Sequence, residues 1–314
     1  MRALVRDLAL ALRQCVLPML GSHAGRAHGD ELGGGGDVTF AIDAAAEELL
    51  GSFLRERAPD VAYYSEDQGL VAPDGASTVL IVDPIDGTRP AMAGLESCCV
   101  SIAAAPLRDG VTMGEVEIGC VVEIPSGVVF LAERGQGIVE APQVRLSANE
   151  RLDRMFWTYG FRGRPARPTI EVIGDLIDIS SVGGGEFDLG SACFNMTRLL
   201  TGQLDAYVEP GPRLIADVPA TRAEFERVGG GVVLNNSPYD LAAAALLLEE
   251  GGAIVSDAYG RPLSDRELLG SGVEFQMSIV CSSNRVLHDA ILEQVDLGID
   301  RLRVGLRPEV SDPS

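Results

Sequence analysis

The chain has 314 residues, of which 46% are hydrophobic, and its formal net charge of −21 comes from 46 acidic and 25 basic side chains. This length and composition suit one large or two ordinary folded domains. The acidic excess argues against a surface for nucleic acid or for an anionic membrane. Lysine is absent, which excludes Walker A, Schiff-base and kinase-type lysine mechanisms. Because no apolar run approaches the ~20 residues of a membrane span, we expect a cytoplasmic protein without membrane association.

The first half of the chain predicts two helices, a loop between them and an antiparallel sheet. Apolar positions from Leu4 to Val16 recur at helical spacing, and Ala44–Arg57 is rich in Ala, Glu and Leu. The glycine run Gly33–Gly36 follows no strand and ends in no phosphate-binding side chain, so we interpret it as a mobile hinge. Short apolar runs separated by turns predict the sheet, at 61–64, 79–82, 99–105, 118–124 and 128–132.

The second half changes to alternating strands and helices, which predicts a partly parallel α/β layer. We place a domain boundary at Pro142–Asp153, giving domains 1–146 and 147–314. Residues 210–237 have no clear period except near 220–228, so this segment is predicted to be an inserted excursion or lid. The expected strands are 156–159, 179–182, 204–208, 253–255 and 279–281, and the expected helices are 169–177, 192–200, 241–250 and 284–294.

The most informative stretch joins the strand at 79–82 to two carboxylates, Asp83 and Asp86. Pro84 lies between them and restricts the backbone, so both side chains can face one point. Two converging carboxylates repel each other unless a cation lies between them. Gly87 then permits a tight turn that leaves backbone N–H groups available to an anion. The stretch therefore predicts a metal site beside a phosphate site.

Further acidic residues stand at the ends of other predicted elements. Asp43 is explained equally well as a helix N-cap, and Glu66 with Asp67 as a solvated turn. Taken together with Asp240, however, these acids resemble the inositol monophosphatase family over residues 37 to 293. The resemblance rests on Asp83-Pro-Ile-Asp-Gly-Thr88, Ser65-Glu-Asp67, Tyr239-Asp-Leu-Ala-Ala through Gly251-Gly252, Asp37-Val-Thr-x-x-x-Asp43, Gly190-Ser-Ala-Cys193 and Leu204-Asp-Ala-Tyr-Val-Glu209.

The resemblance implies a layered αβαβα sandwich of the sugar-phosphatase type and a Mg²⁺-dependent phosphomonoesterase acting on a small phosphorylated polyol or sugar. It implies two or three Mg²⁺ ions per site and a homodimer. By the family match, Glu66, Asp83 and the Ile85 carbonyl would hold the first ion, and Asp83, Asp86 and Asp240 the second. The family match also implies that Asp43, Thr88 and Glu66 are catalytic residues and that Gly87 and Thr88 bind phosphate. It implies substrate binding by Ser191, Ala192 and Glu209.

The sequence departs from the family pattern at several positions. A lysine that relatives often carry ahead of Asp43 is replaced by the glycine run, Asp67 stands where a second glutamate is usual, and Arg89-Pro90 follows the central motif. The segment between Glu209 and Asp240 is much longer than usual, and we expect it to overhang the site, bringing Arg213, Arg222 and Arg227 toward a remote group of the substrate. These departures leave an alternative: a catalytically silent relative that binds a phosphorylated ligand or acts as an interaction subunit.

Overall fold

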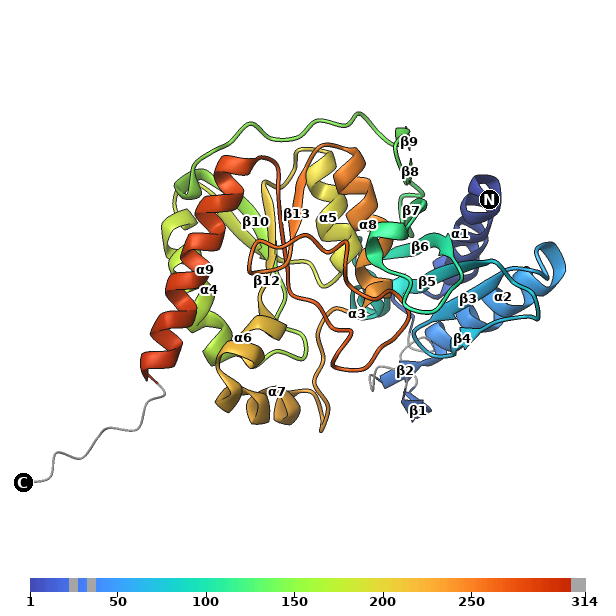
Figure 1. Cartoon of the computed structure of the whole chain (residues 1–314), viewed down its shortest axis with the longest axis horizontal. Helices are drawn as coiled ribbons and strands as arrows, with labels where there is room; N and C mark the ends of the chain where they lie inside the picture. The colour runs from blue at the N-terminus through green and yellow to red at the C-terminus, as the bar shows by residue number, and fades with distance from the viewer. Residues whose placement is uncertain (23–27, 33–37, 306–314) are drawn as a thin grey trace, which may run out of the picture.

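The computed structural model describes residues 1–22, 28–32 and 38–305, and for 28–32 and 38–39 it describes the backbone alone. The glycine run Gly33–Gly36 therefore lies outside the described residues. Helices and sheets alternate in layers, in the order helix, sheet, helix, sheet, helix (Figure 1). The layered α+β fold expected from the family resemblance is confirmed.

The first sheet has seven strands in the order β4-β3-β5-β6-β7-β8-β9. Only β3 and β5 pair in parallel, and every other neighbouring pair is antiparallel, as the predicted meander requires. One face packs against α1 (Arg2–Val16) and α2 (Ala41–Arg57). The strands are β3 (Ala62–Ser65), β4 (Gly69–Val71), β5 (Thr78–Asp86), β6 (Cys99–Pro106), β7 (Ile118–Glu123), β8 (Val129–Glu133) and β9 (Gly137–Glu140). A separate pair, β1 (His28–Leu32) and β2 (Val38–Phe40), is antiparallel.

The second sheet has five strands in the order β11-β10-β12-β14-β13 and is partly parallel, as the alternating sequence predicts. Its outer face packs against α4 (Ala166–Ser180) and α9 (Arg285–Gly305). The segment joining the sheets crosses one end of the molecule (Figure 1), although the predicted division into two domains at this segment stays a prediction. The strands are β10 (Phe156–Tyr159), β11 (Gly185–Asp188), β12 (Ala206–Glu209), β13 (Ile254–Ser256) and β14 (Ile279–Ser282).

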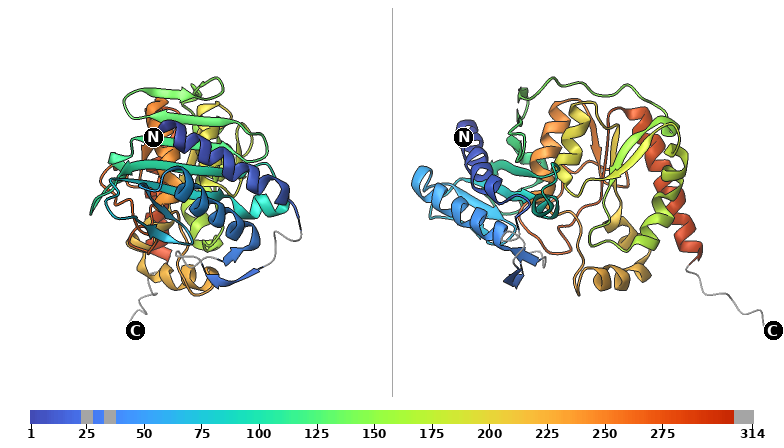
Figure 2. Two further views of the ribbon diagram at one scale, coloured as in Figure 1. Left: turned by 90° about the vertical axis from the view of Figure 1, so that its right-hand side faces the viewer. Right: turned by 180° about the vertical axis from the view of Figure 1, so that it is seen from behind.

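Two helices, α5 (Ala192–Leu200) and α8 (Pro238–Glu250), fill the layer between the sheets, as the right-hand view in Figure 2 shows. Ala and Leu occupy α8 on every side, and residues 241–248 are all buried. A helix that is apolar all round needs neighbours all round, and α8 contacts α5 and both sheets. Since α8 begins with Pro238 after Ser237, the central layer also fixes where Asp240 lies.

The structure corrects the predicted strand at 179–182. There α4 continues through Ser180, and the strand is β11, which begins at Gly185. Ile179 and Val182 are β-branched, which favoured the strand. The helix prevails because the buried Ser180 hydroxyl accepts a hydrogen bond from Trp157 Nε1 at 2.9 Å and donates one to Leu176 O at 2.8 Å. Three other predicted helices are also longer than expected: α2 begins at Ala41, α8 begins at Pro238, and α9 extends to Gly305.

The inserted segment forms α6 (Gly211–Asp217) and α7 (Arg222–Val228), which lie at one end of the second sheet beside α4 (Figure 1). Arg213 is buried there and forms ion pairs with Asp217 and with Asp296 of α9, at 3.2 and 2.6 Å. Arg222 pairs with Glu226 at the surface. The helical part of the insertion is therefore attached to the outer helix layer.

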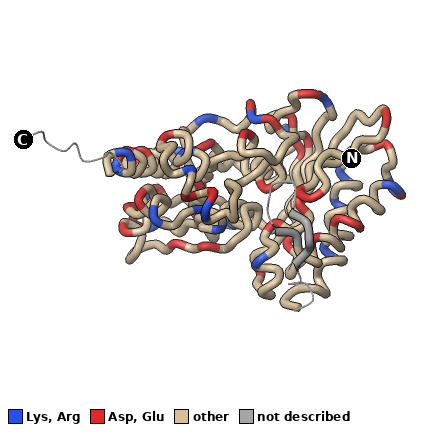
Figure 3. Tube along the Cα trace, turned by 90° about the horizontal axis from the view of Figure 1, so that it is seen from below, with Lys and Arg blue, Asp and Glu red and all other residues tan. Residues whose placement is uncertain are grey.

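Charged residues are scattered over the molecule. Figure 3 shows acidic positions along both halves of the trace, with basic positions distributed among them rather than gathered in one band. Within the described part of the chain, no helix is both long enough and apolar enough to cross a membrane.

His288 on α9 is a buried titratable group held between two hydroxyls. Its Nε2 lies 2.8 Å from Ser256 Oγ and its Nδ1 2.9 Å from Ser282 Oγ. Burial, and then the nearby Arg285, lower the pKa of His288 to about 4, although Asp289 opposes them. The unfolded imidazole takes up a proton below about pH 6.5, whereas the folded one does so only near pH 4. His288 therefore lowers the free energy of unfolding as the pH falls through this window.

We expect His288→Gln to remove this part of the pH dependence. Denaturant unfolding between pH 7 and 4.5 should show wild-type stability falling more steeply, by up to about 3 kcal/mol. Other titrating groups are common to both proteins, so the difference between the two curves isolates His288. Parallel curves would show that His288 does not titrate in this way.

Candidate active site

Three carboxylates converge where β5 ends. Asp83 and Asp86 are buried at the end of β5, where the register with β6 shifts between them. Asp240 lies in the first turn of α8, where it accepts a hydrogen bond from Ser237 N at 2.6 Å in a capping box. One oxygen from each of Asp83, Asp86 and Asp240 falls within 4.8 Å of the other two. A strand end and a helix start thus bring together acids from distant parts of the chain.

Glu66 joins this group because β3 and β5 run in parallel. Ser65 at the end of β3 pairs with Val82, so Glu66 follows β3 at the same sheet edge where Asp83 follows Val82. Glu66 lines the same cleft as Asp83, Asp86 and Asp240. All four carboxylates predicted as metal ligands therefore line one cleft.

The electrostatics of this group fit a cation. Burial, followed by the neighbouring carboxylates, raises the pKa of Asp83, Glu66 and Asp240. Burial also raises the pKa of Asp86, but hydrogen bonds from Ser191 and from the start of α5 oppose it. A divalent cation bound between these carboxylates would offset the repulsion between their negative charges. Mg²⁺ prefers oxygen ligands such as these. The donor set therefore suits the metal that the family resemblance implies.

Asp86 also joins the sheet to α5. Its Oδ2 accepts hydrogen bonds from Ser191 Oγ at 2.7 Å and Cys193 N at 2.5 Å, and its Oδ1 accepts one from Ala192 N at 3.2 Å. Ser191 is the N-cap of α5 and accepts from Phe194 N. Two predicted substrate residues, Ser191 and Ala192, are thus held against a predicted metal ligand.

Asp43 and Thr88, the pair predicted to orient water, are brought together. Thr88 Oγ1 lies 3.3 Å from Asp43 Oδ1 and 3.2 Å from the Ile85 carbonyl oxygen, so its single proton can be donated to either. Asp43 is not the N-cap of α2, which is Phe40, but the third residue of the helix. Its side chain accepts a hydrogen bond from Phe40 N at 2.9 Å. Burial, as the largest cause, raises the pKa of Asp43 to about 6.

Sequence reasoning missed Glu47, one helical turn after Asp43. Glu47 is buried and its Oε2 accepts hydrogen bonds from Ser65 Oγ and Gln68 Nε2, both at 2.8 Å. These two partners flank Glu66 and Asp67, so Glu47 supports the turn that presents Glu66. The spacing of Asp43 and Glu47 on one helix face was the available signal.

The far wall of the cleft contains side chains that the sequence analysis did not single out. Glu209 lines it as predicted, but beside it stand Arg162 and Arg164 from the loop after β10, and Asn236 from the end of the insertion. The expectation that Arg213, Arg222 and Arg227 face the substrate is wrong for the described cleft, because none of the three lines it. Of the insertion, only its last residues, from Leu234 onward, reach this wall.

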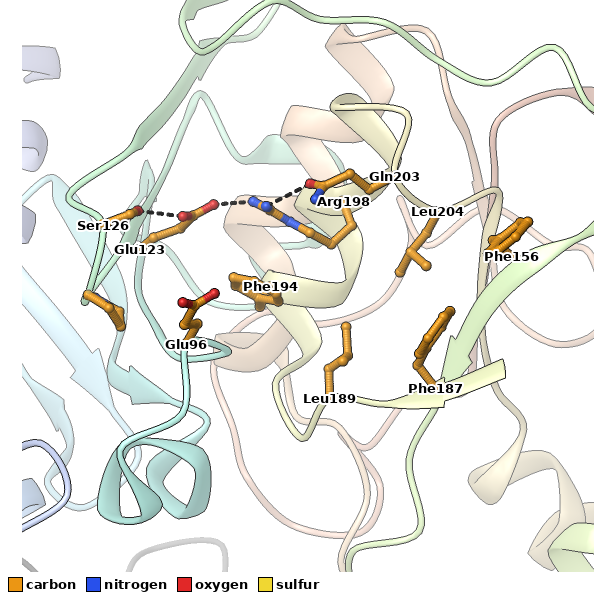
Figure 4. Close-up of a pocket in the computed structure, with 11 residues that line it drawn as sticks. Glu96, Glu123, Ser126, Phe156, Phe187, Leu189, Phe194, Arg198, Gln203 and Leu204 are labelled. Atoms are coloured by element: carbon orange, nitrogen blue, oxygen red, sulfur yellow. Dashed lines mark hydrogen bonds and ion pairs between the residues drawn. The ribbon is translucent and has the colours of Figure 1, made fainter. Parts of the chain in front are cut away.

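A larger cavity of about 630 Å³ lies elsewhere between the two sheets (Figure 4). Phe194 and Arg198 of α5 point into it, opposite Phe187 and Glu123. Arg198 forms an ion pair with Glu123 and stacks over Phe194 at 4.3 Å. None of the acids at the end of β5 lines this cavity, so the predicted chemistry belongs to the narrower, more polar cleft.

Comparison with known proteins agrees with this geometry. The model of the inositol monophosphatase family matches residues 3–299. The chain belongs to the inositol monophosphatase family. An inositol-1-monophosphatase of Mesorhizobium japonicum is 24% identical over 269 residues, covering 84% of this chain and 85% of the relative. A fructose-1,6-bisphosphatase/inositol-1-monophosphatase of Methanothermobacter thermautotrophicus is 25% identical over 302 residues, covering 92% and 94%.

The solved structure of the extragenic suppressor protein suhB from Bartonella henselae superposes with a TM-score of 0.69 at 19% identity, covering 93% of this chain and 97% of that one. At that identity the likeness supports the fold. Inositol monophosphatase family membership supports general phosphatase activity and dependence on a metal.

Proposed function

We propose that this chain is a Mg²⁺-dependent phosphomonoesterase that hydrolyses a small phosphorylated polyol or sugar, with two or three Mg²⁺ ions per site. The observation that carries the proposal is the meeting of Asp83, Asp86 and Asp240, with donor atoms within 4.8 Å, beside the Thr88–Asp43 hydrogen bond. Bound Mg²⁺ would neutralise phosphate oxygens and lower the pKa of a bound water. In this proposal Glu66, Asp83, the Ile85 carbonyl, Asp86 and Asp240 hold the ions.

The chain's own groups would then position the reactants. Asp43, through Thr88, accepts the proton of the attacking water, and Glu66 assists in orienting that water. The N–H groups of Gly87 and Thr88 face the phosphate oxygens where α3 (Thr88–Ala93) begins. Ser191, Ala192 and Glu209 form the side of the cleft that meets the leaving group. The homodimer and the cytoplasmic location expected from the sequence stay predictions.

A panel of phosphate esters tests this proposal directly. Phosphate release from sugar monophosphates, sugar bisphosphates, inositol phosphates and 3′-phosphonucleotides would be measured with Mg²⁺ and again after chelation. We expect release from at least one ester that chelation abolishes and added Mg²⁺ restores. Binding of an ester without turnover of any would instead identify the catalytically silent relative.

A further inference from the structure

Asn195 is a buried amide on the wall of the acidic cleft. It lies in α5, four residues after Ser191, and its backbone N donates to Ser191 O at 3.1 Å. Residues four apart share one face of a helix, and Asn195 lines the cleft together with Ser191 and Ala192. Only 2% of Asn195 is exposed. Its side chain therefore belongs to the cleft wall, one helical turn behind the residues that hold Asp86.

The amide group of Asn195 forms no hydrogen bond with any residue that the structure describes, and its Oδ1 is buried. A buried amide without partners destabilises a fold, and such groups are rare in native proteins. A half-turn about the last side-chain bond exchanges the amide oxygen and nitrogen, so either atom can be presented to a ligand. Asn195 thus keeps a hydrogen-bonding capacity that the described fold does not use.

Glu209, which the sequence predicts to bind substrate, already has partners at both carboxylate oxygens. Its Oε2 accepts from Tyr207 OH at 3.0 Å, and Asn236 Nδ2 donates to that same hydroxyl at 3.1 Å. Its Oε1 lies 2.8 Å from Arg164 Nε, and only 4% of its side chain is exposed. A substrate hydroxyl would have to displace one of these partners before it could donate to Glu209. Glu209 therefore builds the wall but offers little to a hydroxyl group.

The hydroxyl of Ser191 is committed in the same way, because it donates to Asp86 Oδ2 at 2.7 Å and accepts from Phe194 N at 3.1 Å. Tyr159 and Asp188 also line the cleft, but Tyr159 is half-buried and Asp188 is exposed. A substrate hydroxyl bound at either of these two replaces a water molecule of similar hydrogen-bonding capacity, so it adds little selectivity. A buried amide discriminates more strongly, because a substrate without the hydroxyl leaves it unpaired.

We propose that Asn195 binds a hydroxyl of the leaving group, on the carbon next to the one that carries the phosphate. The hydroxyl must be close to the ester because Asn195 lies one turn of helix, about 5.4 Å, beyond Ser191, which contacts the proposed metal ligand Asp86. An amide has no formal charge to offset an anion, so it suits a neutral hydroxyl. This inference rests on the proposed function and adds a specificity-determining residue to it.

The competing explanation is that a buried water satisfies Asn195 and that the side chain serves packing alone. The two explanations differ in whether the effect of Asn195 depends on where the substrate carries its hydroxyl.

The test compares two isomers of equal charge, 1,2-propanediol 1-phosphate and 1,3-propanediol 1-phosphate, which differ only in the position of one hydroxyl. With Mg²⁺ we expect wild-type kcat/KM to favour the 1,2 isomer, whose hydroxyl is next to the phosphate-bearing carbon, by about 5- to 30-fold. Asn195→Leu removes both hydrogen-bonding groups at similar volume, so it should bring this ratio close to 1 and leave the 1,3 isomer within about threefold. Its melting temperature should not fall, because apolar contacts replace an unsatisfied amide.

Thr197→Val is the matched control on the same helix. Thr197 is equally buried and its hydroxyl donates to Phe194 O at 3.0 Å, but it does not line the cleft. We expect Thr197→Val to lower the melting temperature and to keep the wild-type ratio between the isomers. Asn195→Ala repeats the test if Asn195→Leu does not fold.

Equal losses on both isomers in Asn195→Leu, or a wild-type enzyme that does not distinguish the isomers, would overturn the inference. Turnover of other esters with neither hydrolysis nor binding of these two isomers would overturn it as well. If no ester of any kind is hydrolysed, the proposed function fails. Calorimetric binding of the two isomers with Mg²⁺ then decides the inference by the same ratio.

Discussion

Asp86→Asn is expected to lower Mg²⁺-dependent phosphate release by about a thousandfold or more, equivalent to about 4 kcal/mol in the barrier. The substitution removes one of three converging charges at the proposed metal site. Both Asp86 carboxylate oxygens accept hydrogen bonds from Ser191, Ala192 and Cys193, and the substitution replaces one of these oxygens with an amide nitrogen that cannot accept. The lost hydrogen bond lowers the stability of the fold, but removing the repulsion between residue 86 and Asp83 offsets part of this loss. We therefore expect a folded variant. Phosphate release at saturating Mg²⁺, and the rise in melting temperature on adding Mg²⁺, measure the two consequences.

Asp205→Asn is the matched control for this substitution. Asp205 is equally buried and accepts hydrogen bonds from Phe156 N at 2.8 Å and Asn149 Nδ2 at 3.2 Å, but it lies outside the acidic cleft. We expect Asp205→Asn to lose some stability but to keep its activity within a few-fold of wild type. Turnover of Asp86→Asn within tenfold of wild type, or an equal loss in Asp205→Asn, would exclude the proposed metal-binding role of Asp86.

The central part of the site could be predicted because its geometry is local. Asp83 to Thr88 form one strand end and one turn, so their chemistry follows from six consecutive residues. The place of Glu66 follows from one further rule, that the carboxyl ends of neighbouring parallel strands lie at the same edge of a sheet. Asp240 lies at a helix start that Ser237 and Pro238 already mark in the sequence. The strongest signals were therefore short-range ones.

The two arginines on the far wall of the cleft could not be predicted in the same way. Arg162 and Arg164 occur in a loop without a period, and the contacts of Arg164 with Glu209 and Asn236 depend on how three distant segments pack. Conversely, Arg213 was expected at the cleft because the insertion follows Glu209 in sequence, yet Asp296 of α9 pairs with it elsewhere. Tertiary packing and ion pairing decide which arginines line the cleft, and the local pattern of a single sequence does not contain that information.

Gly87→Ala should disable the site by displacing its backbone. Gly87 has a φ of +93°, and an added Cβ would lie 2.7 Å from the carbonyl oxygen of Ser97 and 2.9 Å from Ser191 Cβ. The first of these is backbone, so Gly87 itself must move and carry Asp86 and Thr88 with it. Displacements approaching 1 Å cost about a hundredfold in rate, and the strain should lower the free energy of unfolding by about 3 kcal/mol.

Gly110→Ala separates that contact from the backbone conformation alone. Gly110 also has a positive φ, +64°, but a Cβ there would meet nothing within 4 Å. We expect a stability loss of about 1 to 2 kcal/mol and unchanged phosphate release. Kinetics and denaturant unfolding of both variants provide the comparison. Similar activity in Gly87→Ala and Gly110→Ala would contradict this prediction. It would show that Asp86 and Thr88 still work after the backbone shift, so the close approach of Gly87 to Ser97 is not needed to position them.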